Sequence, residues 1–271
     1  MQDLTITFIG AGNMARSLLS GLLAAGAAPQ RLRASDPEAG QRQAIAELGV
    51  VTFDDNDTAV ADADLVVLAV KPQVLGRVLE PLTLGSGQLV VSIAAGVPLD
   101  ALERWTPAGT PIVRCMPNTP ALLGAGITGM FANAAVSEAQ RDAADAVLRS
   151  AGRTLWVAEE GALDAVTGVS GSGPAYFFYL MEAMIDAGVE AGLSREAATT
   201  LTLETAYGAA RMAREGADPP AQLRANVTSP GGTTERAVSI LEAARFRDTV
   251  GQAVAGAAQR ARELAEDIAR S

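Results

Sequence analysis

The chain has 271 residues, enough to bury the cores of one large or two modest domains. Hydrophobic residues make up 49% and charged residues 19%, which excludes a disordered chain. The formal net charge is −10, so the protein repels phosphate backbones and anionic membranes at long range. We therefore expect no nucleic-acid partner and no membrane partner, and no apolar run reaches the roughly 18 residues of a membrane span.

Two scarce residue types narrow the chemistry. There is no histidine, which excludes histidine-based triads, histidine general acids and nearly all zinc hydrolases, and we expect no metal site. The single cysteine, Cys115, excludes an internal disulfide and suits a cytoplasmic location. We expect Cys115 to be a small core residue.

The first part of the chain alternates β-rich runs with helical stretches, which is typical of a parallel sheet covered by helices. The run at 65–70 is continuously apolar, as in a strand buried on both faces. Between the last two predicted strands lies a predicted helix, Glu138–Arg149. The predicted strands are Leu4–Gly10, Arg31–Ser35, Val50–Phe53, Leu65–Val70, Leu89–Ile93, Ile112–Met116, Ile127–Phe131 and Thr154–Val157.

After about residue 160 the strand signals stop, and the pattern becomes helical. The predicted helices are Pro174–Gly192, Arg195–Gly216, Thr234–Ala244 and Phe246–Arg270. The first of them is apolar around much of its circumference, so it must be buried. We predict an α/β domain at 1–160 and an all-α domain at 161–271, the latter burying its excess apolar surface against another copy of itself.

A glycine-rich segment follows the first predicted strand and opens the first helix. It reads G-x-G-x-x-A, with Gly10 for the tight turn, Gly12 for close approach to a pyrophosphate and Ala15 for packing of the helix on the strand. The following helix start supplies amides and a partial positive charge. We interpret residues 1–160 as a Rossmann domain that binds a dinucleotide; the alternative is a purely structural glycine turn.

The second predicted strand ends in Ser35 and Asp36, which bear on the cofactor. Asp36 lies near the position where an acid binds the adenine ribose hydroxyls of NAD, and it should repel a 2′-phosphate. Ser35 could instead donate to a 2′-phosphate, with Arg31 and Arg33 close by. Alternatively, Asp36 forms an Asx-type turn or caps the next helix. The acid favours NADH, and NADPH stays open.

Three further strand ends carry candidate residues, because the carboxyl ends of parallel strands line the ligand crevice. Lys71, the chain's one lysine, follows the fourth strand. A functional need for an ammonium group at this position and codon bias are both adequate explanations for a single lysine in a chain that otherwise uses arginine. Ala95 and Gly96 follow the fifth, where small residues would let a nicotinamide lie against the backbone. Asn118, after the sixth, could hold a carboxamide or substrate, or simply form a turn between two prolines.

Two glycine-rich loops open helices in the second domain. The first, 169–176, contains Ser172 and places Pro174 in the first helical turn. The second, 228–235, presents consecutive amides and two hydroxyls at a helix start. Both are candidate carboxylate sites, and each is also readable as an ordinary capping loop.

Taken in order, six motifs resemble the pyrroline-5-carboxylate reductase family over essentially the whole chain. They are Gly-Ala-Gly-Asn-Met-Ala at 10–15, Ala-Val-Lys-Pro at 69–72, Ser-Ile-Ala-Ala-Gly-Val at 92–97, Met-Pro-Asn-Thr-Pro at 116–120, Val-Ser-Gly-Ser-Gly-Pro-Ala-Tyr at 169–176 and Ser-Pro-Gly-Gly-Thr-Thr at 229–234. The resemblance implies an NAD(P)H-dependent enzyme that makes L-proline from 1-pyrroline-5-carboxylate.

The resemblance also implies roles for particular residues. Thr234 would place its hydroxyl on the ring nitrogen as the catalytic group. The family resemblance further implies an intertwined dimer through the helical domain, often assembled into a decamer of five dimers. The cofactor residues expected from motif and resemblance together are Ile9, Gly10, Ala11, Gly12, Asn13, Met14, Ser35, Asp36, Asn56, Ala69, Val70, Lys71, Pro72, Ala95 and Gly96. The expected substrate residues are Asn118, Ser172, Ser229, Gly231, Gly232, Thr233 and Thr234.

The absence of histidine suits imine reduction, because an iminium can arrive already protonated and needs no strong general acid. Two alternatives remain. A β-hydroxyacid dehydrogenase needs a lysine on the first long helix of the second domain, and Pro174–Gly192 has none. A non-catalytic NAD(P)-sensing protein would keep the cofactor loop and lose the second-domain loops, but both loops are intact.

Overall fold

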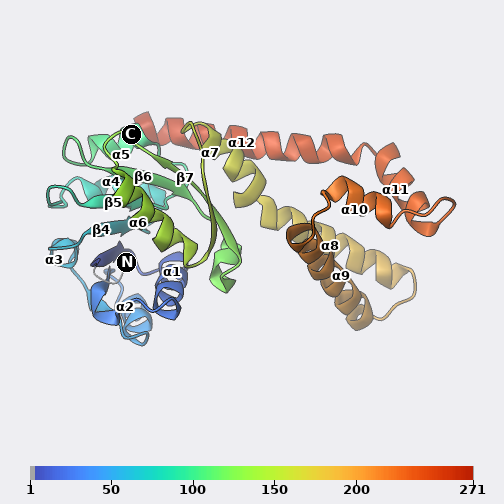
Figure 1. Ribbon diagram of the computed structural model, residues 1–271, viewed down its shortest axis with the longest axis horizontal. Helices are drawn as coiled ribbons and strands as arrows, with labels where there is room; N and C mark the ends of the chain where they lie inside the picture. The colour runs from blue at the N-terminus through green and yellow to red at the C-terminus, as the bar shows by residue number, and fades with distance from the viewer. Residues whose placement is uncertain (1–3, 271) are drawn as a thin grey trace. The chain divides into compact units, whose positions relative to one another are not determined.

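The computed structural model describes residues 4–270 and divides into two compact units (Figure 1). The first comprises the chain up to Ser172 together with residues from Ala255 onward, and the second comprises Gly173–Val254. The first unit extends beyond the expected limit at 160 because the segment after β8 packs on the sheet: a Cβ on Gly129 would lie 2.7 Å from Cγ1 of Val166. The division at 160 and 161 itself stays a prediction.

The described part of the first unit forms one eight-stranded sheet in the order β3-β2-β1-β4-β5-β6-β7-β8. The first six strands are parallel, and their order is that of a Rossmann fold. The predicted α/β class is therefore confirmed, but the last two strands run opposite to the others, β7 pairing antiparallel to β6. The strands are β1 (Ile6–Ile9), β2 (Leu32–Ser35), β3 (Val51–Phe53), β4 (Leu65–Leu68), β5 (Leu89–Ser92), β6 (Ile112–Met116), β7 (Gly126–Ala132) and β8 (Gly152–Trp156).

Helices cover both faces of this sheet (Figure 1), because successive side chains of a strand point to opposite sides. Phe8 belongs to the core cluster that includes Leu18 and Val147, whereas Ile9 belongs to the cluster of Leu75 and Leu102. The helices of the unit are α1 (Asn13–Ala24), η1 (Pro29–Arg31), α2 (Ala39–Ala46), α3 (Asn56–Val60), α4 (Pro72–Leu79), α5 (Leu99–Arg104), η2 (Thr119–Leu123), α6 (Glu138–Arg149), α7 (Ala162–Val166) and the π-turn η3 (Thr167–Gly171).

Local sequence explains why α6 has the predicted limits. Ser137 accepts a hydrogen bond from the Gln140 backbone amide, and the Gln140 side chain accepts from the Ser137 amide, which is a capping box. Cys115, in the neighbouring core, is 2% exposed, as expected for a small core residue. Burial raises the pKa of its thiol, so Cys115 is unreactive.

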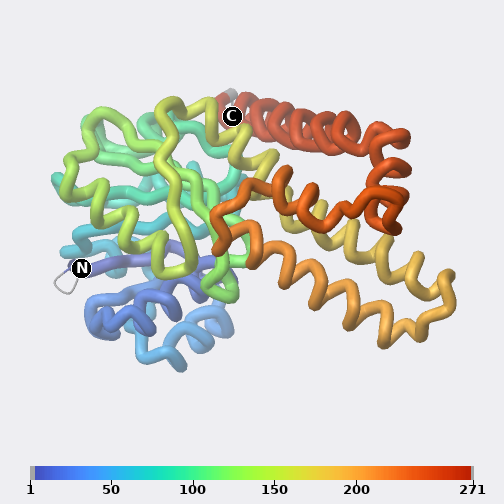
Figure 2. The backbone as a smooth tube through the Cα atoms, turned by 45° about the vertical axis from the view of Figure 1, so that its right-hand side comes forward, coloured from blue at the N-terminus to red at the C-terminus, as the bar shows by residue number. Residues whose placement is uncertain are grey.

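The second unit is helical. α8 (Gly173–Glu190) and α9 (Arg195–Glu215) form a hairpin in Figure 2, with α10 (Pro220–Asn226) and α11 (Thr233–Ala243) following. The side chain of Ser194 caps α9 by accepting from the Ala197 amide. Small residues let the hairpin close, since a Cβ on Gly188 would lie 3.1 Å from Cβ of Ala198. The last helix, α12 (Phe246–Arg270), begins in this unit and ends in the first.

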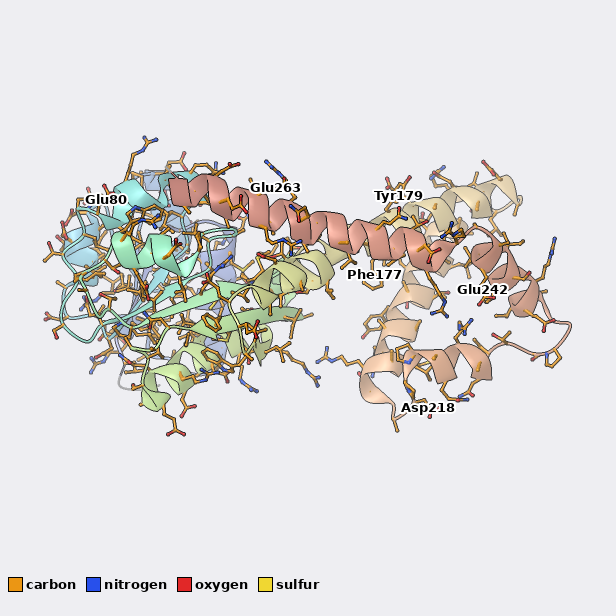
Figure 3. The ribbon with its side chains drawn as sticks, turned by 90° about the horizontal axis from the view of Figure 1, so that it is seen from above. Glu80, Phe177, Tyr179, Asp218, Glu242 and Glu263 are labelled. Atoms are coloured by element: carbon orange, nitrogen blue, oxygen red, sulfur yellow. The ribbon has the colours of Figure 1, made fainter. Side chains whose placement is uncertain are left out.

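Large apolar side chains of the second unit are exposed in the single chain. Within α8 the buried residue is Gly173, and α10 and α11 have no buried residue among those described. Phe177 and Tyr179, labelled in Figure 3, are 65% and 76% exposed. A monomer does not leave so much apolar surface in water, so this unit needs a covering partner. Other exposed apolar residues here are Phe178, Leu180, Met184, Leu201, Leu203, Tyr207, Met212, Val227, Ile240 and Leu241.

Among the helices of residues 4–270, none has the length and apolar character needed to cross a membrane.

Candidate functional site

The turn after β1 requires glycine. Gly10 has a φ of +97°, and its amide donates to the Ser35 carbonyl at 2.8 Å. A Cβ at this position would lie 2.8 Å from the carbonyl oxygen of Ala69. Gly10 therefore permits both the left-handed turn and the close approach of the chain after β4.

Gly12 fronts open space instead. It is the N-cap of α1, no side chain caps the helix there, and a Cβ on Gly12 would meet no atom within 4 Å. The amides of Asn13 and Met14, in the first helical turn, have no carbonyl partner within the helix. Together with the helix dipole they fit a pyrophosphate, and bulk at Gly12 would fill the space in front of them.

The structure brings the two predicted cofactor loops together. Ala69 donates its amide to the Ile9 carbonyl at 2.8 Å, so residues 9–14 and 69–72 lie side by side. Their strands, β1 and β4, are neighbours at the point where the strand order reverses, which is where open α/β sheets bind ligands. Lys71 is exposed at the N-cap of α4, and Pro72 occupies the first position of that helix.

Ser35 and Asn56 meet at the ends of β2 and β3. The buried Ser35 hydroxyl donates to Oδ1 of Asn56 at 2.7 Å. The bond brings together two of the expected cofactor residues, which are 21 positions apart in the sequence.

Asp36 is held by two backbone amides. Its Oδ2 accepts from Ala11 at 2.9 Å and its Oδ1 accepts from Glu38 at 2.9 Å. The second bond is the Asx-type turn that was one of the two interpretations of Asp36. The first ties the end of β2 to the glycine-rich loop, so the carboxylate also borders the predicted cofactor loop, and the two interpretations do not exclude each other.

The two arginines suggested as partners of a 2′-phosphate point elsewhere. Arg31 donates to Oγ1 of Thr5, ahead of β1, and Arg33 donates to the carbonyl of Ala61 at 2.5 Å. That part of the expectation is wrong, because both side chains are engaged away from the carboxyl end of β2. The cation at that end is Arg42, which donates to the carbonyls of Asp36 and Pro37 at 2.7 and 2.9 Å. No local sequence pattern predicts this role of Arg42, because it depends on a helix residue folding back onto the preceding turn.

The turn after β5 carries Ala95 and Gly96. Ala95 is exposed and Gly96 has a φ of +74°. A Cβ on Gly96 would lie 3.6 Å from Cβ of Leu264, so the C-terminal part of α12 packs beside this turn. The small side chains leave the backbone accessible, as a nicotinamide site would need.

Asn118 is buried, at 9% exposed, and braces two segments. Its Nδ2 donates to the Ser170 carbonyl at 3.1 Å, and its Oδ1 accepts from the Ile127 amide at 3.0 Å. Asn118 thus links β7 to the π-turn. Ser172, the residue after this turn, is half-buried. A Cβ at Gly171 would lie 2.5 Å from the methyl group of Met116, so the Met116 side chain packs directly against this turn.

A buried charge cluster lies beside these segments, and the sequence did not point to it. Arg114, on β6, contacts Glu160 at 2.5 Å, and Glu160 also accepts from the Leu99 amide at 2.8 Å. Burial raises the pKa of Asp164 above its ordinary value, while the positive charges of Arg114 and Arg262 oppose that shift. This cluster joins the sheet to α7 and to the C-terminal part of α12.

The second candidate loop, 229–234, starts α11. Gly231 has a φ of +70°, and its amide donates to Oε2 of Glu235 at 2.8 Å. Gly232 is the N-cap, without a side-chain cap, and donates to the Ser229 carbonyl at 3.0 Å. Thr234 is half-buried in the first helical turn, whereas Ser229 and Thr233 are exposed. The loop therefore gathers helix-start amides and hydroxyl groups, as a carboxylate site would require.

The Rossmann sheet and its uncapped glycine-rich helix start define an NAD(P)-dependent oxidoreductase. Residues 5–96 match the family "NADP oxidoreductase coenzyme F420-dependent", and residues 160–264 match "Pyrroline-5-carboxylate reductase dimerisation". A pyrroline-5-carboxylate reductase of Pseudomonas aeruginosa is 54% identical over 97% of both chains. A Coxiella burnetii pyrroline-5-carboxylate reductase structure is 43% identical with a TM-score of 0.93, covering 96% of this chain and 98% of that one. A Plasmodium falciparum pyrroline carboxylate reductase with NADP bound is 31% identical with a TM-score of 0.85, covering 98% and 99%.

The chain belongs to the pyrroline-5-carboxylate reductase family. Its reaction is transfer of hydride from NAD(P)H to the C=N carbon of 1-pyrroline-5-carboxylate, which gives L-proline and completes proline biosynthesis. The match to the family's dimerisation region, residues 160–264, includes the whole second unit, and the protein is a homodimer. The alternatives of a β-hydroxyacid dehydrogenase and a non-catalytic sensor are thereby set aside.

Proposed function

We propose that this reductase works by positioning its substrate with helix-start amides and by holding the ring nitrogen with the Thr234 hydroxyl. The observation that carries the proposal is the N-terminus of α11, where Gly232 provides no side-chain cap and Thr234 is half-buried. A helix start of this kind attracts an anion. The substrate brings a carboxylate, and its imine lies one bond beyond the carbon that bears it.

The loop 229–234 holds the carboxylate in this proposal. The Thr233 amide and the Ser229 hydroxyl are the donors, whereas Gly232, whose own amide bonds the Ser229 carbonyl, and Gly231, with its positive φ, shape the turn. Glu235 supports the loop by accepting a hydrogen bond from the amide of Gly231, one residue before the N-cap of α11. Fixing the carboxylate restricts the orientation of the ring and so holds the imine carbon in position for hydride transfer.

In this proposal the Thr234 hydroxyl forms a hydrogen bond with the ring nitrogen. A hydroxyl group can donate to a neutral imine or accept from an iminium, so one side chain serves both protonation states of the substrate. Because an iminium is already protonated, the chain needs no residue with a pKa near 7 at this place, in keeping with the absence of histidine. We expect Asn118 and Ser172 to border the ring, with Asn118 acting mainly through the segments that it braces.

The dinucleotide is held by the loop residues 9–14 and 69–72, with Ser35, Asp36 and Asn56 toward the adenosine and Ala95 and Gly96 toward the nicotinamide. When bound, the dihydronicotinamide supplies the hydride. The fit rests on the uncapped start of α1 and the open space at Gly12. We further propose that dimers assemble into a decamer of five dimers and that the enzyme is cytoplasmic.

The test is the kinetics of Thr234→Ala with both substrates varied. We expect kcat/KM for 1-pyrroline-5-carboxylate to fall by roughly 10- to 100-fold, the effect of one or two lost site hydrogen bonds, with the dissociation constant of the nucleotide unchanged. Wild-type kinetics in this variant would remove Thr234 from the mechanism.

A further inference from the structure

The turn between β5 and α5, residues 93–98, is the part of the proposed cofactor site that meets the nicotinamide. Its first residue is tied to the sheet, because the Ile93 amide donates to the last carbonyl of β4 at 3.2 Å. Ala94 and Val97 are buried, which leaves residues 95–96 as the tip of the turn. Whatever fixes the other end of the turn, at the start of α5, therefore fixes where this tip lies.

The start of α5 is held by a residue from a distant part of the chain. The N-cap of this helix is Pro98, whose side chain has no acceptor for the free amides of the first turn. Glu160 provides one from 61 positions away, since its Oε1 accepts from the Leu99 amide at 2.8 Å. The far end of the nicotinamide turn is thus set by a tertiary contact and not by the residues of the turn itself.

Arg114 keeps the Glu160 carboxylate at this place. The same Oε1 accepts from Nη1 of Arg114 at 2.5 Å, and the Arg114 side chain is 9% exposed. Arg114 lies beside Ser92, the last residue of β5, in the register of the parallel sheet. Because a buried guanidinium group is costly without its partner, the carboxylate does not leave this position readily. One oxygen atom therefore connects the sheet at the end of β5 to the start of α5.

The segment that begins at Glu160 also reaches the substrate side of the first unit. It continues through α7 into η3, where the Ser170 carbonyl accepts from Nδ2 of Asn118 at 3.1 Å. Along the way, Val166 packs against β7, since a Cβ on Gly129 would lie 2.7 Å from its Cγ1. A single packed segment thus contacts both the nicotinamide turn and Asn118, which we expect to border the substrate ring.

We propose that Glu160, held by Arg114, is a positioning residue for hydride transfer, because it fixes the nicotinamide turn relative to the substrate border. The inference rests on the proposed placement of the nicotinamide at Ala95 and Gly96. Hydride transfer depends steeply on the distance between the donor and acceptor carbons. A turn that is free to shift at Leu99 therefore lowers the rate although every group that touches the reactants is still present.

The test compares the binding of NADH with that of ADP-ribose, which lacks the nicotinamide ring, by calorimetric titration of the whole protein. We expect the wild type to bind NADH more tightly, and Glu160→Ala to reduce this advantage by about tenfold with ADP-ribose binding unchanged. Glu160→Asp keeps the charge, but its side chain is one methylene too short to reach both donors, so the same reduction is expected. Glu160→Gln keeps an oxygen at the right distance and should stay within about threefold of the wild type. NADPH and ADP-ribose 2′-phosphate form the equivalent pair of ligands.

Asp164→Asn is the matched control. It removes a carboxyl group that interacts with Arg114 in the same cluster and leaves the bond between Glu160 and the Leu99 amide in place. The advantage of NADH over ADP-ribose should therefore equal that of the wild type.

Turnover gives a second readout. In Glu160→Asp, kcat at saturating nucleotide should fall by about tenfold, whereas KM for 1-pyrroline-5-carboxylate should change by less than about threefold, because loop 229–234 holds the substrate carboxylate.

Three outcomes would overturn the role of Glu160. They are a full NADH advantage in both Glu160→Ala and Glu160→Asp, an equal loss of NADH and ADP-ribose in Glu160→Asp, and the same loss of NADH advantage in Asp164→Asn. Wild-type protein that binds NADH no more tightly than ADP-ribose would instead overturn the placement of the nicotinamide, and the inference with it. Binding needs no turnover, so wild-type kinetics in Thr234→Ala would count against the proposed mechanism alone.

Discussion

The Asp36 carboxylate accepts a hydrogen bond from the Ala11 amide at 2.9 Å, so the end of β2 fixes the glycine-rich loop that follows β1. The Gly10 amide makes a second connection, to the Ser35 carbonyl at 2.8 Å. The loop is therefore preorganised, and binding a dinucleotide does not require it to be ordered first.

Gly10 and Gly12 should respond differently to alanine. Gly12→Ala adds a methyl group to open space, so we expect an unchanged melting temperature and nucleotide binding weakened by about tenfold or more, because the methyl group fills the pyrophosphate position. Gly10→Ala puts a Cβ 2.8 Å from the Ala69 carbonyl at a positive φ and should lower stability by about 1–3 kcal/mol. Thermal unfolding and calorimetric titration check the pair, and equal effects of the two variants would contradict it.

The proposed role of Thr234 predicts a specific kinetic pattern. Thr234→Ala should lower kcat/KM by roughly 10- to 100-fold without changing the melting temperature. Thr234→Ser keeps the hydroxyl and should recover most of the rate. As a control, Thr249→Ala removes a helix hydroxyl that bonds the Arg245 carbonyl at 3.3 Å and should leave steady-state kinetics at the wild-type level. Recovery by serine no better than by alanine would exclude a hydroxyl role.

The exposed apolar face of the second unit predicts where the dimer can be broken. Tyr179 is 76% exposed in the single chain, so Tyr179→Arg should place a charge in the interface and favour monomers. Leu155→Arg, at a 56% exposed site on β8 of the first unit, is the matched control and should stay dimeric. Sedimentation velocity distinguishes the species, and a dimeric Tyr179→Arg variant would show that this face is not covered by the partner.

The ion pair between Arg114 and Glu160 should matter for stability because its arginine side chain is 9% exposed. Arg114→Met leaves Glu160 without its partner, and we expect the free energy of unfolding to fall by about 2 kcal/mol, less than for a fully buried pair. Arg149→Met breaks the pair with Asp145, whose arginine side chain is 64% exposed, and should cost about 0.5 kcal/mol or less. Denaturant unfolding at neutral pH checks both values, and equal costs would contradict the argument from burial.

Asp164 predicts a pH dependence of stability. Its raised pKa means that the folded protein keeps this proton to higher pH than the unfolded chain does. The free energy of unfolding of the wild type, relative to that of Asp164→Asn, should therefore fall as the pH rises from near 3.8, the ordinary pKa, to the raised pKa. Above the raised pKa this difference should not change further. Asp142→Asn, on the exposed side of α6, is the control. A wild-type advantage that grows with pH would reverse the predicted sign.

Much of the fold could be predicted from sequence, because local patterns determine it. The capping box at Ser137 gives the start of α6, and apolar runs give six parallel strands within a few residues. The reversal of β7 was not predictable, since an apolar run does not encode strand direction. α10 was missed because Pro219 and Pro220 are typical of a turn, yet Pro220 occupies the first helical position.

The candidate site divides in the same way. The cofactor loop was predictable because glycine spacing reports backbone geometry directly. The double bonding of Asp36, the direction of Arg33 and the Arg114–Glu160 pair depend on contacts between distant segments, which local sequence does not determine. The candidate carboxylate loop before α11 is assigned a substrate role through its likeness to a family, since its glycines alone also suit an ordinary cap.

The most direct test of the account is the oxidation of NADH and of NADPH by the purified protein with 1-pyrroline-5-carboxylate, run beside a panel of 3-oxo acids. We expect nicotinamide absorbance to fall only with the cyclic imine and one L-proline to form for each nucleotide oxidised. Turnover of a 3-oxo acid in preference to the imine, or tight nucleotide binding with no turnover of any substrate, would contradict it.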